Sequence, residues 1–567
     1  MNSLSIKHFA ILAACLFALI AATWLTHIGE RKLANPDEGR YSVLAMHMAD
    51  TGDFVTPRLN GLKYFEKPPM QYWMTAAAFN TFGKSEWSAR LYTALAGLLS
   101  ILLVSYTAAR LFTREIGMFT ALALVACPYY MMLAEIVTLD MGLTLWTTLS
   151  VCGFLLSQRG LPHPPSKTEK LGWLLTGWAA AGAAVLSKGL IGLVFPAAIL
   201  FLYCLIQWDW RRLARINWLS GFLIFFLIAA PWFVLVAQQN PEFLQFFFIH
   251  EHWQRFTTTQ SRRVQAWWFF LPILFAGCMA WALMLIPAML RGWQAGHHQA
   301  MAASDGTRPF KPLRFVILWI VFIVFFFSIS GSKLPAYVLP VFPFIAMVLA
   351  FFIAATPGRR LAWHVAPVVP IALLLAWYLN TQPSIRARNA FELALYRDYA
   401  DILTVALVAL AIGTAMGVVF FWRNTKVSKR WGVTLVAVAS VVMVNRVATG
   451  YEKLSPLQSG HAMSQAIAKS LTADTRLYAV NTYDQTAPFY LGRQFTLVDY
   501  VDEFSMGLKS EPHKHIARLE DFPPAWQAPG AVIAIIPPQD VDKMQELGLH
   551  FDIIFESPRR VAIAKRQ

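Results

Sequence analysis

Two adjacent carboxylates, Asp37 and Glu38, stand in a setting that could hold them in place for chemistry. They follow Asn35-Pro36, and the step before a proline favours a turn or an extended backbone. They precede Gly39-Arg40-Tyr41, where an amphipathic helix is expected to open. A solvated loop is the ordinary alternative for neighbouring acidic residues. The turn before the pair and the helix after it favour a fixed pair that could orient a substrate or accept a proton.

Basic side chains surround this pair in the segment from about residue 30 to residue 90. They include Arg31, Lys32, Arg40, Arg58, Lys63 and Lys67. Further ionisable residues interrupt apolar sequence later in the chain, at Glu135, Asp140, Lys188, the HEHWQRF segment (His250, Glu251, His252, Arg255) and Lys333. A guanidinium group can bind two phosphate oxygens at once, and an ammonium group binds anions as a point charge. The set therefore predicts an anion site, with phosphate as the natural ligand.

The elements that must position these residues are membrane helices. Of the 567 residues, 57% are apolar and 14% are charged, against roughly 25% charged in an ordinary soluble protein. The formal net charge is +16, but the basic residues lie in short loops between apolar runs, which argues against a nucleic-acid-binding protein. All five cysteines also fall inside apolar runs, which argues against a disulfide framework or a zinc cluster.

Apolar runs long enough to cross about 30 Å of hydrocarbon predict thirteen transmembrane helices. They lie near residues 8–29, 90–109, 116–134, 139–158, 172–187, 189–207, 216–237, 266–289, 314–330, 337–355, 361–379, 401–421 and 431–446. The first is expected to be a retained anchor, because its apolar run is longer than that of a cleaved signal peptide. Arg and Lys on alternate loops put the N-terminus in the cytoplasm and, with an odd number of spans, the tail in the periplasm.

The tail, residues 448–567, is predicted to be a small soluble α/β domain, separate from a membrane domain at residues 1–447. Strand-like runs (RLYAVN, AVIAIIP, FDIIFES, RVAIAK) alternate in it with helix-like segments (HAMSQAIAKSL, PQDVDKMQELG). It carries no glycine-rich phosphate loop and no triad motif. A structural or substrate-guiding cap is therefore the expected role of the tail.

This topology puts the charged residues described above on the outer face, where the positive-inside rule keeps Lys and Arg rare. Ionisable groups at the membrane edge cost free energy unless they are paired or in contact with water. A set drawn from five separate loops on one side therefore predicts a polar cavity that binds anions. Pairing with each other or with lipid head groups is the alternative for each residue.

At this point the residues resemble a known family. An acidic pair in the first outer loop, a polytopic membrane body and a C-terminal domain are similar to the GT-C superfamily of glycosyltransferases, which use polyprenyl-phosphate sugars. The fuller series resembles the bacterial aminoarabinose transferases that modify lipid A, and it consists of NPDEGRY, FEKPPMQYW, TLD at Asp140, SKG at Lys188, HEHWQRF and KLPAYVLPVFP. The resemblance runs along most of the membrane body and is weakest in the tail.

The resemblance implies transfer of 4-amino-4-deoxy-L-arabinose from undecaprenyl phosphate to a lipid A phosphate at the periplasmic face of the inner membrane. Such a transfer lowers the negative surface charge and gives resistance to cationic peptides such as polymyxin. The implied partners are the undecaprenyl-phosphate sugar donor, lipid A and membrane lipids. A GT-C glycosyltransferase with a protein or other glycan acceptor stays open. A transporter or flippase for lipid-linked sugars is a further alternative, although the sequence shows no convincing internal repeat.

The resemblance also implies roles for individual residues. Asp37 is expected to orient the acceptor or to take its last proton, and Glu66 and Asp140 are expected to position the sugar or its amino group. The residues expected to bind phosphate are Arg40, Tyr41 and Lys67, followed by Lys188, Arg255, Lys333 and Tyr337. No cofactor is certain. A divalent metal stays open, since Glu38, Glu66, His250 and His252 carry suitable ligand atoms but no spacing forces a site.

Overall fold

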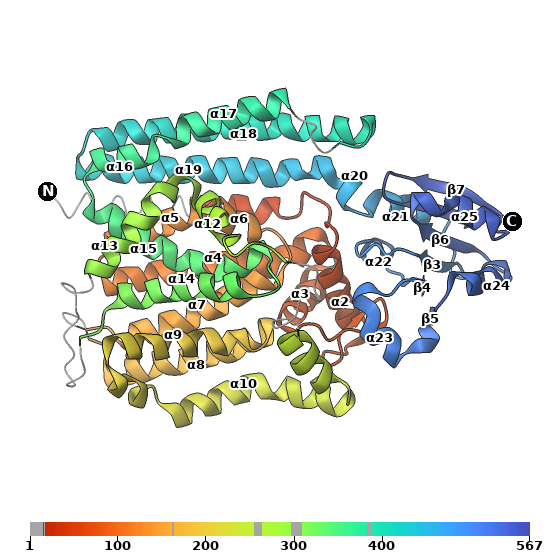
Figure 1. Cartoon of the computed structure of the whole chain (residues 1–567), viewed down its shortest axis with the longest axis horizontal. Coiled ribbons are helices and arrows are strands. Elements are labelled where there is room, and N and C mark those ends of the chain that lie inside the picture. Colours follow the sequence, from red (N-terminus) through yellow and green to blue (C-terminus); the bar gives the residue numbers. More distant parts are fainter. Residues whose placement is uncertain are drawn as a thin grey trace. The chain divides into compact units, whose positions relative to one another are not determined.

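The computed structural model describes residues 15, 18–160, 164–254, 264–295, 309–382 and 387–566. The chain divides into two compact units, and Figure 1 labels many of their elements. The first unit comprises Met1–Ile28, Tyr92–Ile385 and Ala400–Gly450, and the second comprises Gly29–Leu91, Arg386–Tyr399 and Tyr451–Gln567. The segment 30–90 therefore packs in the same unit as the tail, whereas the sequence groups it with the membrane domain.

The first unit is built from helices. In chain order they are α4 (Glu86–Leu111), α5 (Arg114–Val125), α6 (Pro128–Leu133), α7 (Leu139–Ser157), α8 (Lys167–Lys188), α9 (Ile191–Gln207), η1 (Trp210–Arg215), α10 (Trp218–Gln239), η2 (Gln245–Gln254), α12 (Phe270–Cys278), η3 (Met279–Met284), α13 (Leu285–Ala295), α14 (Pro312–Ile329), η4 (Pro335–Val341), α15 (Phe342–Ala355), α16 (Gly358–Val365), α17 (Val368–Thr381), α18 (Ala390–Trp422) and α19 (Lys426–Gly450). The first turns of α4 and α18 belong to the second unit.

The predicted membrane body is confirmed. Within the described ranges, nine helices are long and apolar enough to cross a membrane, and Ala18–His27 and Ile191–Gln207 form two shorter apolar helices. Each span predicted from residue 90 onward falls largely on helical residues. The total of thirteen spans stays a prediction.

Several helices differ from the predicted spans, and the physical reason is plain for two of these spans. The predicted span 116–134 is divided, since α5 ends at Val125 and α6 begins at Pro128. Proline lacks the backbone N–H, and its ring clashes with the preceding turn, so a helix cannot continue through it undisturbed. The predicted span 401–421 is the apolar part of α18, which already begins at Ala390. Charged residues such as Asp398 end an apolar window without ending a helix.

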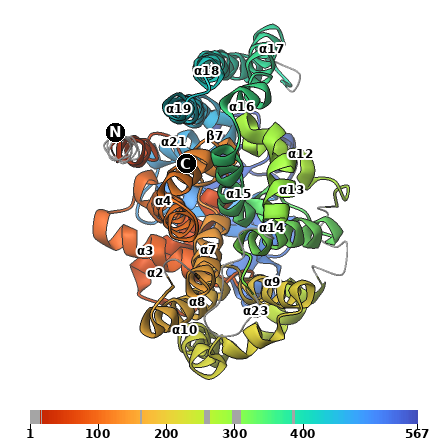
Figure 2. The same ribbon diagram turned by 90° about the vertical axis from the view of Figure 1, so that its left-hand side faces the viewer.

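Helix α15 forms the centre of the first unit. Figure 2 looks along the helices and shows α15 surrounded by its neighbours. All twelve residues from Phe342 to Ile353 are buried. A helix that is apolar on every side is stable only when other helices surround it. Because α15 follows η4 directly, its burial also fixes the turn that carries Tyr337.

The second unit combines the 30–90 segment with the tail. The segment contributes α2 (Asp37–Thr51), β1 (Arg58–Leu59), β2 (Leu62–Lys63) and α3 (Met70–Phe82). The tail contributes η5 (Tyr451–Leu454), α20 (Ser455–Gln458), α21 (His461–Lys469), β3 (Arg476–Val480), α22 (Ala487–Leu491), β4 (Thr496–Val498), η6 (Asp502–Phe504), α23 (Ser505–Ser510), η7 (Pro512–Lys514), β5 (His515–Ile516), η8 (Leu519–Asp521), α24 (Phe522–Gln527), β6 (Val532–Ile536), η9 (Pro538–Asp540), α25 (Val541–Glu546), β7 (Phe551–Glu556) and β8 (Val561–Lys565).

The tail contains one mixed sheet in the order β5-β4-β3-β6-β8-β7. Strands β5, β4, β3 and β6 pair in parallel, and β8 runs antiparallel to both β6 and β7. The α/β pattern predicted for the tail is confirmed, and the four predicted strands are β3, β6, β7 and β8. The prediction missed β4 and β5, which have three and two residues and are too short to show an alternating pattern.

The 30–90 segment and the tail are joined by close backbone approach and by hydrogen bonds. A Cβ atom added at Gly39 would lie 2.6 Å from the backbone of Gln485. Asn60 exchanges two hydrogen bonds with the backbone of Phe495, at 2.6 and 2.8 Å. Since the first contact needs a residue without a side chain, α2 can pack against the tail only with glycine at position 39.

We expect Gly39→Ala to weaken this packing and to lower the melting temperature of the detergent-purified protein. The added methyl group must displace the backbone of Gln485, and overpacking of this kind costs roughly 1–3 kcal/mol. The matched control is Gly172→Ala in helix α8, where an added Cβ meets nothing within 4 Å. The control should keep or raise the melting temperature, because alanine favours a helix. Equal melting temperatures for both variants would contradict the packing described here.

Candidate active site

Glu38 is the buried centre of an ion-pair network. Its carboxylate accepts hydrogen bonds from Arg90 Nε at 2.7 Å, from Arg31 Nη1 at 3.3 Å and from the backbone N–H of Ala34 at 3.0 Å. Burial by itself raises the pKa of Glu38, but Arg31 and Arg90 outweigh it and lower the pKa to about 2. Glu38 therefore remains ionised and holds the start of α2, and the bonds to its oxygens compete with a metal ion for them.

Asp37, the neighbouring residue, is in a different environment. Its side chain is 47% exposed, and its Oδ1 accepts a hydrogen bond from Arg40 Nη1 at 3.2 Å. Arg40 also pairs with Glu503, which accepts a further hydrogen bond from Gln485 Nε2 at 3.1 Å. Burial raises the pKa of Glu503, and Arg40 opposes that shift. The guanidinium of Arg40 thus fixes an accessible carboxylate on one side and a buried carboxylate from the tail on the other.

Three tyrosines lie around Arg40. Tyr41 packs against Tyr72 with ring centroids 5.9 Å apart. In the described part of the chain, the buried hydroxyls of Tyr64 and Tyr72 and the Nε–H of Arg40 have no hydrogen-bond partner. Burial raises the pKa of Tyr64 and Tyr72, so both hydroxyls stay protonated near neutral pH. Buried donors without partners are expensive, and a ligand rich in oxygen atoms would satisfy them.

Glu66 and Lys67 follow directly in the same segment. Both are half-buried, and Lys67 Nζ donates to the backbone oxygen of Glu66 at 2.8 Å. After burial, the charge of Glu66 is the next largest cause of the raised pKa of Tyr72, so it lies near the tyrosines. The residues Pro68-Pro69 then restrict the backbone before α3 begins. The second unit therefore gathers Asp37, Arg40, Tyr41 and Glu66, with Lys67 next to Glu66.

The first unit holds another charged cluster. Lys188, at the end of α8, pairs with Asp140 in the first turn of α7. The Lys188 ammonium also lies over the ring of Tyr337, 4.6 Å from its centroid. Three residues from distant parts of the sequence thus meet in the structure. The tyrosine face adds a cation–π attraction that keeps the ammonium in place.

Lys333 belongs to the turn before Tyr337. It is buried, and its Nζ donates to the backbone oxygen of Ser330 at 2.7 Å. Within the described residues, the buried hydroxyls of Ser332, Thr138 and Tyr129 have no hydrogen-bond partner. Thr138 precedes Asp140 by two residues, and Ser332 precedes Lys333. The hydroxyls of Thr138 and Ser332 therefore lie on the same turns as Asp140 and Lys333.

An apolar groove lies beside the C-terminal half of α14, the half that leads to this turn. It has a volume of about 430 Å³ and is lined from α12, α13, α14 and α15 by side chains that include Leu271, Ile286 and Phe325. Its lining reaches Ser328, two residues before the Ser330 that binds Lys333. A groove of this kind fits a hydrocarbon chain rather than a sugar.

The HEHWQRF segment is only partly described. His250 and His252 lie on η2, but their side chains are outside the described part, and Arg255 lies wholly outside it. In the described part of the chain, no group of three His, Cys, Asp or Glu residues is arranged to hold a metal ion. The predicted metal ligands and the phosphate role of Arg255 therefore stay predictions.

Several residues of these clusters were missed by the sequence reasoning. Tyr64 precedes the FEKPPMQYW motif and Tyr72 lies within it, and their spacing around Glu66 was the available signal. Tyr129 gave no signal, because a tyrosine in an apolar run is usually part of the core. Glu503 could not be found from sequence, since it is 463 residues from its partner Arg40.

Family models match both parts of the chain. Residues 463–565 match the aminoarabinose transferase C-terminal domain, and residues 9–247 match the dolichyl-phosphate-mannose-protein mannosyltransferases.

Two curated relatives are both named undecaprenyl phosphate-alpha-4-amino-4-deoxy-L-arabinose arabinosyl transferase. The one from Aeromonas salmonicida is 32% identical over 432 residues, which cover 74% of this chain and 73% of the relative. The one from Pseudomonas paraeruginosa is 31% identical over 390 residues, which cover 68% of this chain. This second alignment spans 62% of the length of the Pseudomonas protein, less than two thirds.

Two solved structures are similar over nearly the whole chain. ArnT from Cupriavidus metallidurans bound to undecaprenyl phosphate has a TM-score of 0.89 and 32% sequence identity, and the match covers 98% of both chains. The apo state of ArnT from the same organism has a TM-score of 0.88 and 31% identity, covering 99% of this chain and 98% of that one.

The Glu38 network predicts a pH-dependent contribution to stability. Because the folded-state pKa of about 2 is below the ordinary value of 4.5, the stabilisation is present above about pH 4.5 and is lost as the pH falls through 2. Glu38→Gln leaves two guanidinium groups without their counter-charge and should cost roughly 3–5 kcal/mol at pH 7. Melting temperatures of wild type and variant should therefore differ strongly at pH 7 and converge as the pH approaches 2.

The control for this measurement is Asp552→Asn. Asp552 pairs with Arg566 on the surface, with side chains 59% and 63% exposed. Exposed ion pairs contribute little, so the control should melt with the wild type at every pH. A difference between wild type and Glu38→Gln that does not change with pH would contradict an ionised Glu38.

Proposed function

The chain belongs to the family of bacterial aminoarabinose transferases, glycosyltransferases of the GT-C superfamily, and from this premise we propose that it transfers 4-amino-4-deoxy-L-arabinose from undecaprenyl phosphate to a phosphate of lipid A. The observation that carries the proposal is the similarity, over 98% of the chain, to ArnT in complex with undecaprenyl phosphate. The two charged clusters support it, because each offers cationic or hydroxyl groups to phosphate.

The reaction is expected at the periplasmic face of the inner membrane. The positive-inside rule supports this orientation, since basic residues occupy the alternate loops that would face the cytoplasm. These residues include Arg110, Arg114, Arg159, Arg211, Arg215, Arg359, Arg360, Arg423 and Lys426. The 30–90 segment and the residues that follow Gly450 lie on the other side in this topology.

Asp37 is the residue proposed to act on the acceptor. A phosphate monoester has a second pKa of about 6, so an acceptor phosphate is mostly dianionic at neutral pH and needs little help from a base. The exposed carboxylate of Asp37, held by Arg40, can accept the last proton when the phosphate still carries one. Glu38 cannot take this role, because its oxygens are bonded to Arg31 and Arg90.

The bond that breaks joins the sugar C1 to an oxygen of undecaprenyl phosphate, and the electron pair leaves with that phosphate. A lipid A phosphate oxygen forms the new bond to C1. Since the leaving phosphate gains negative charge in the transition state, fixed cations lower the barrier more than they stabilise the bound substrate. Lys188 and Lys333 are proposed for this role. Lys67 and the hydroxyl of Tyr41, in the second unit, are proposed to bind a phosphate group.

Asp140 and Glu66 are proposed to position the sugar. Asp140 already pairs with Lys188 and so also aims the lysine. The amino group of the sugar is cationic at neutral pH, and a carboxylate is its natural partner. The apolar groove beside α14 is proposed to hold the polyprenyl chain of the donor, because it is lined by hydrocarbon and ends near Lys333.

We expect Asp37→Asn to abolish modification of lipid A. The protein would be produced in a Gram-negative strain that makes the aminoarabinose donor but lacks its own transferase, and lipid A would be analysed by mass spectrometry. Loss of the carboxylate that orients the acceptor should reduce transfer about 100-fold or more, because a small misplacement of a reacting group costs about that much. The matched control is Asp50→Asn on the same helix, whose side chain is 51% exposed and pairs with Lys84.

The control variant should modify lipid A as the wild type does. Near wild-type transfer by Asp37→Asn would contradict the role of this residue. Unmodified lipid A from well-expressed wild-type protein would contradict the proposed acceptor, and it would favour a protein or another glycan in its place.

We expect Lys188→Gln to lower kcat for transfer from undecaprenyl phosphate aminoarabinose by about 100-fold, the usual cost of one fixed group that stabilises transition-state charge. Turnover would be measured with purified protein in lipid nanodiscs. The control is Lys167→Gln, an exposed lysine at the opposite end of the same helix. A rise in KM with unchanged kcat would show that Lys188 only binds the donor and would contradict a role in the transition state.

A further inference from the structure

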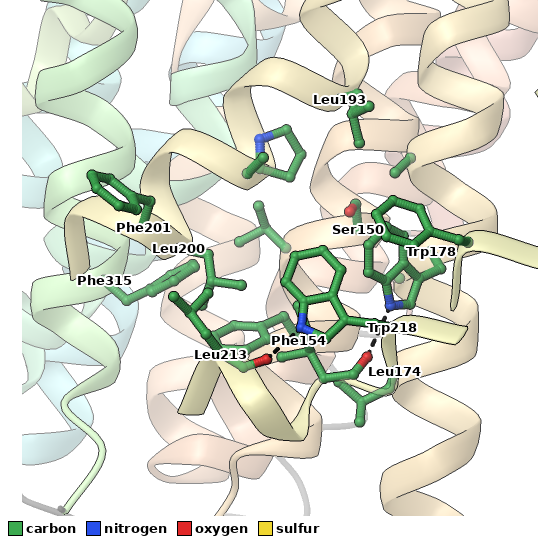
Figure 3. Close-up of a pocket in the computed structure, with 17 residues that line it drawn as sticks. Ser150, Phe154, Leu174, Trp178, Leu193, Leu200, Phe201, Leu213, Trp218 and Phe315 are labelled. Atoms are coloured by element: carbon green, nitrogen blue, oxygen red, sulfur yellow. Dashed lines mark hydrogen bonds between the residues drawn. The ribbon is translucent and has the colours of Figure 1, made fainter. Parts of the chain in front are cut away.

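A second apolar groove opens in the first unit between α7, α8, α9 and α10. Its volume is about 360 Å³, within the range of roughly 300–1,000 Å³ of ligand pockets. Figure 3 shows Leu193 at one end of the groove and Leu174, Leu213 and Trp218 at the other. Its lining is almost entirely hydrocarbon and aromatic rings. The groove is therefore elongated and suited to a single hydrocarbon chain.

Hydrogen bonds fix the end of this groove at Leu213 and Trp218. Trp178 Nε1 donates to the backbone oxygen of Ile216 at 3.0 Å, and Trp218 Nε1 donates to that of Leu213 at 2.8 Å, as the dashed lines in Figure 3 show. An added Cβ at Gly221 would lie 2.2 Å from Trp178 Nε1, so glycine is needed there. Both indole N–H groups are thus used to hold η1, and the ring faces are left to line the groove.

Basic and aromatic side chains lie at this same end. The segment η1, which contributes Leu213 to the lining, also carries Arg211 and Arg215, both exposed. The indoles of Trp208 and Trp210, 69% and 41% exposed, stand next to them. Exposed tryptophans gather at the level of lipid head groups, and arginines near that level attract anionic lipids.

This end lies far from the cluster around Lys188. Leu174 and Lys188 are on the same helix and fourteen residues apart, which is about 21 Å along the axis. A phosphate bound by Arg211 and Arg215 would therefore be near the opposite membrane surface from the Lys188–Asp140 pair. The groove is separate from the residues proposed to act on the sugar donor.

We propose that this groove binds one acyl chain of an anionic phospholipid whose phosphate is held by Arg211 and Arg215. The chain lies against Leu193, Leu200 and the ring faces of Trp178 and Trp218. The concave lining distinguishes this lipid from the lipids that merely surround the helices, and the arginines select a negative head group. This inference does not depend on the proposed transfer reaction.

The test is native mass spectrometry of the full-length, delipidated protein with an equal mixture of phosphatidylglycerol and phosphatidylcholine. The wild type should retain one phosphatidylglycerol in preference. Ala197→Trp, at an exposed position that lines the groove, should lower the bound fraction at least about five-fold. Its control is Ile206→Trp on the same helix, 43% exposed and outside the lining, which should bind lipid as the wild type does.

A double variant, Arg211→Gln with Arg215→Gln, tests the head-group contact. It should lose preference for phosphatidylglycerol by about five-fold per arginine while still binding phosphatidylcholine. The control is Arg359→Gln with Arg360→Gln, an exposed pair on α16. Unchanged lipid retention in Ala197→Trp would overturn the proposal. A second result would also overturn the proposal. In it, the wild type retains added undecaprenyl phosphate but not phosphatidylglycerol, and Ala197→Trp no longer retains the undecaprenyl phosphate. The groove would then hold a polyprenyl chain.

Discussion

Two guanidinium groups, from Arg31 and Arg90, share the buried carboxylate of Glu38, and the arrangement of the second unit depends on this contact. A buried charge without a partner is costly, so the three side chains must meet before α2 can settle at its present position. Once Glu38 is fixed, the neighbouring carboxylate of Asp37 is directed toward solvent. An adjacent acidic pair thus separates into one residue that holds the backbone and one that remains available to a substrate.

In the two charged clusters, too, some charged side chains hold others in position. Both Nη groups of Arg40 are bonded to carboxylates, of Asp37 and of Glu503. Arg40 therefore orients Asp37 and does not offer two Nη groups to a phosphate. Lys188 is held by Asp140 on one side and by the ring of Tyr337 on the other. In both clusters a cation is positioned before a ligand arrives, which is the condition under which electrostatic stabilisation costs no reorganisation.

The sequence predicted those features of the fold that depend on neighbouring residues in the chain. Apolar runs depend only on bilayer thickness, so the helices could be located, and the alternating strands of the tail followed the period of two. The motifs around Asp37, Glu66, Asp140 and Lys188 identified the charged clusters. The partner Glu503 and the docking of the tail on the 30–90 segment could not be predicted, because nothing in a single sequence pairs residues more than 400 positions apart. The break at Pro128 was readable from sequence but was outweighed by the long apolar run.

The joining of the 30–90 segment to the tail has a consequence for biosynthesis. The ribosome makes Glu503 463 residues after Arg40, so α2 can form its contact with Glu503 only after this long stretch of chain has been made. Loop closure over such a separation is a late event in folding. A nascent chain, or one truncated by a stop codon before strand β4, would carry Asp37 and Arg40 without Glu503, the carboxylate from the tail that pairs with Arg40. The membrane would then contain an inserted protein whose second unit is incomplete.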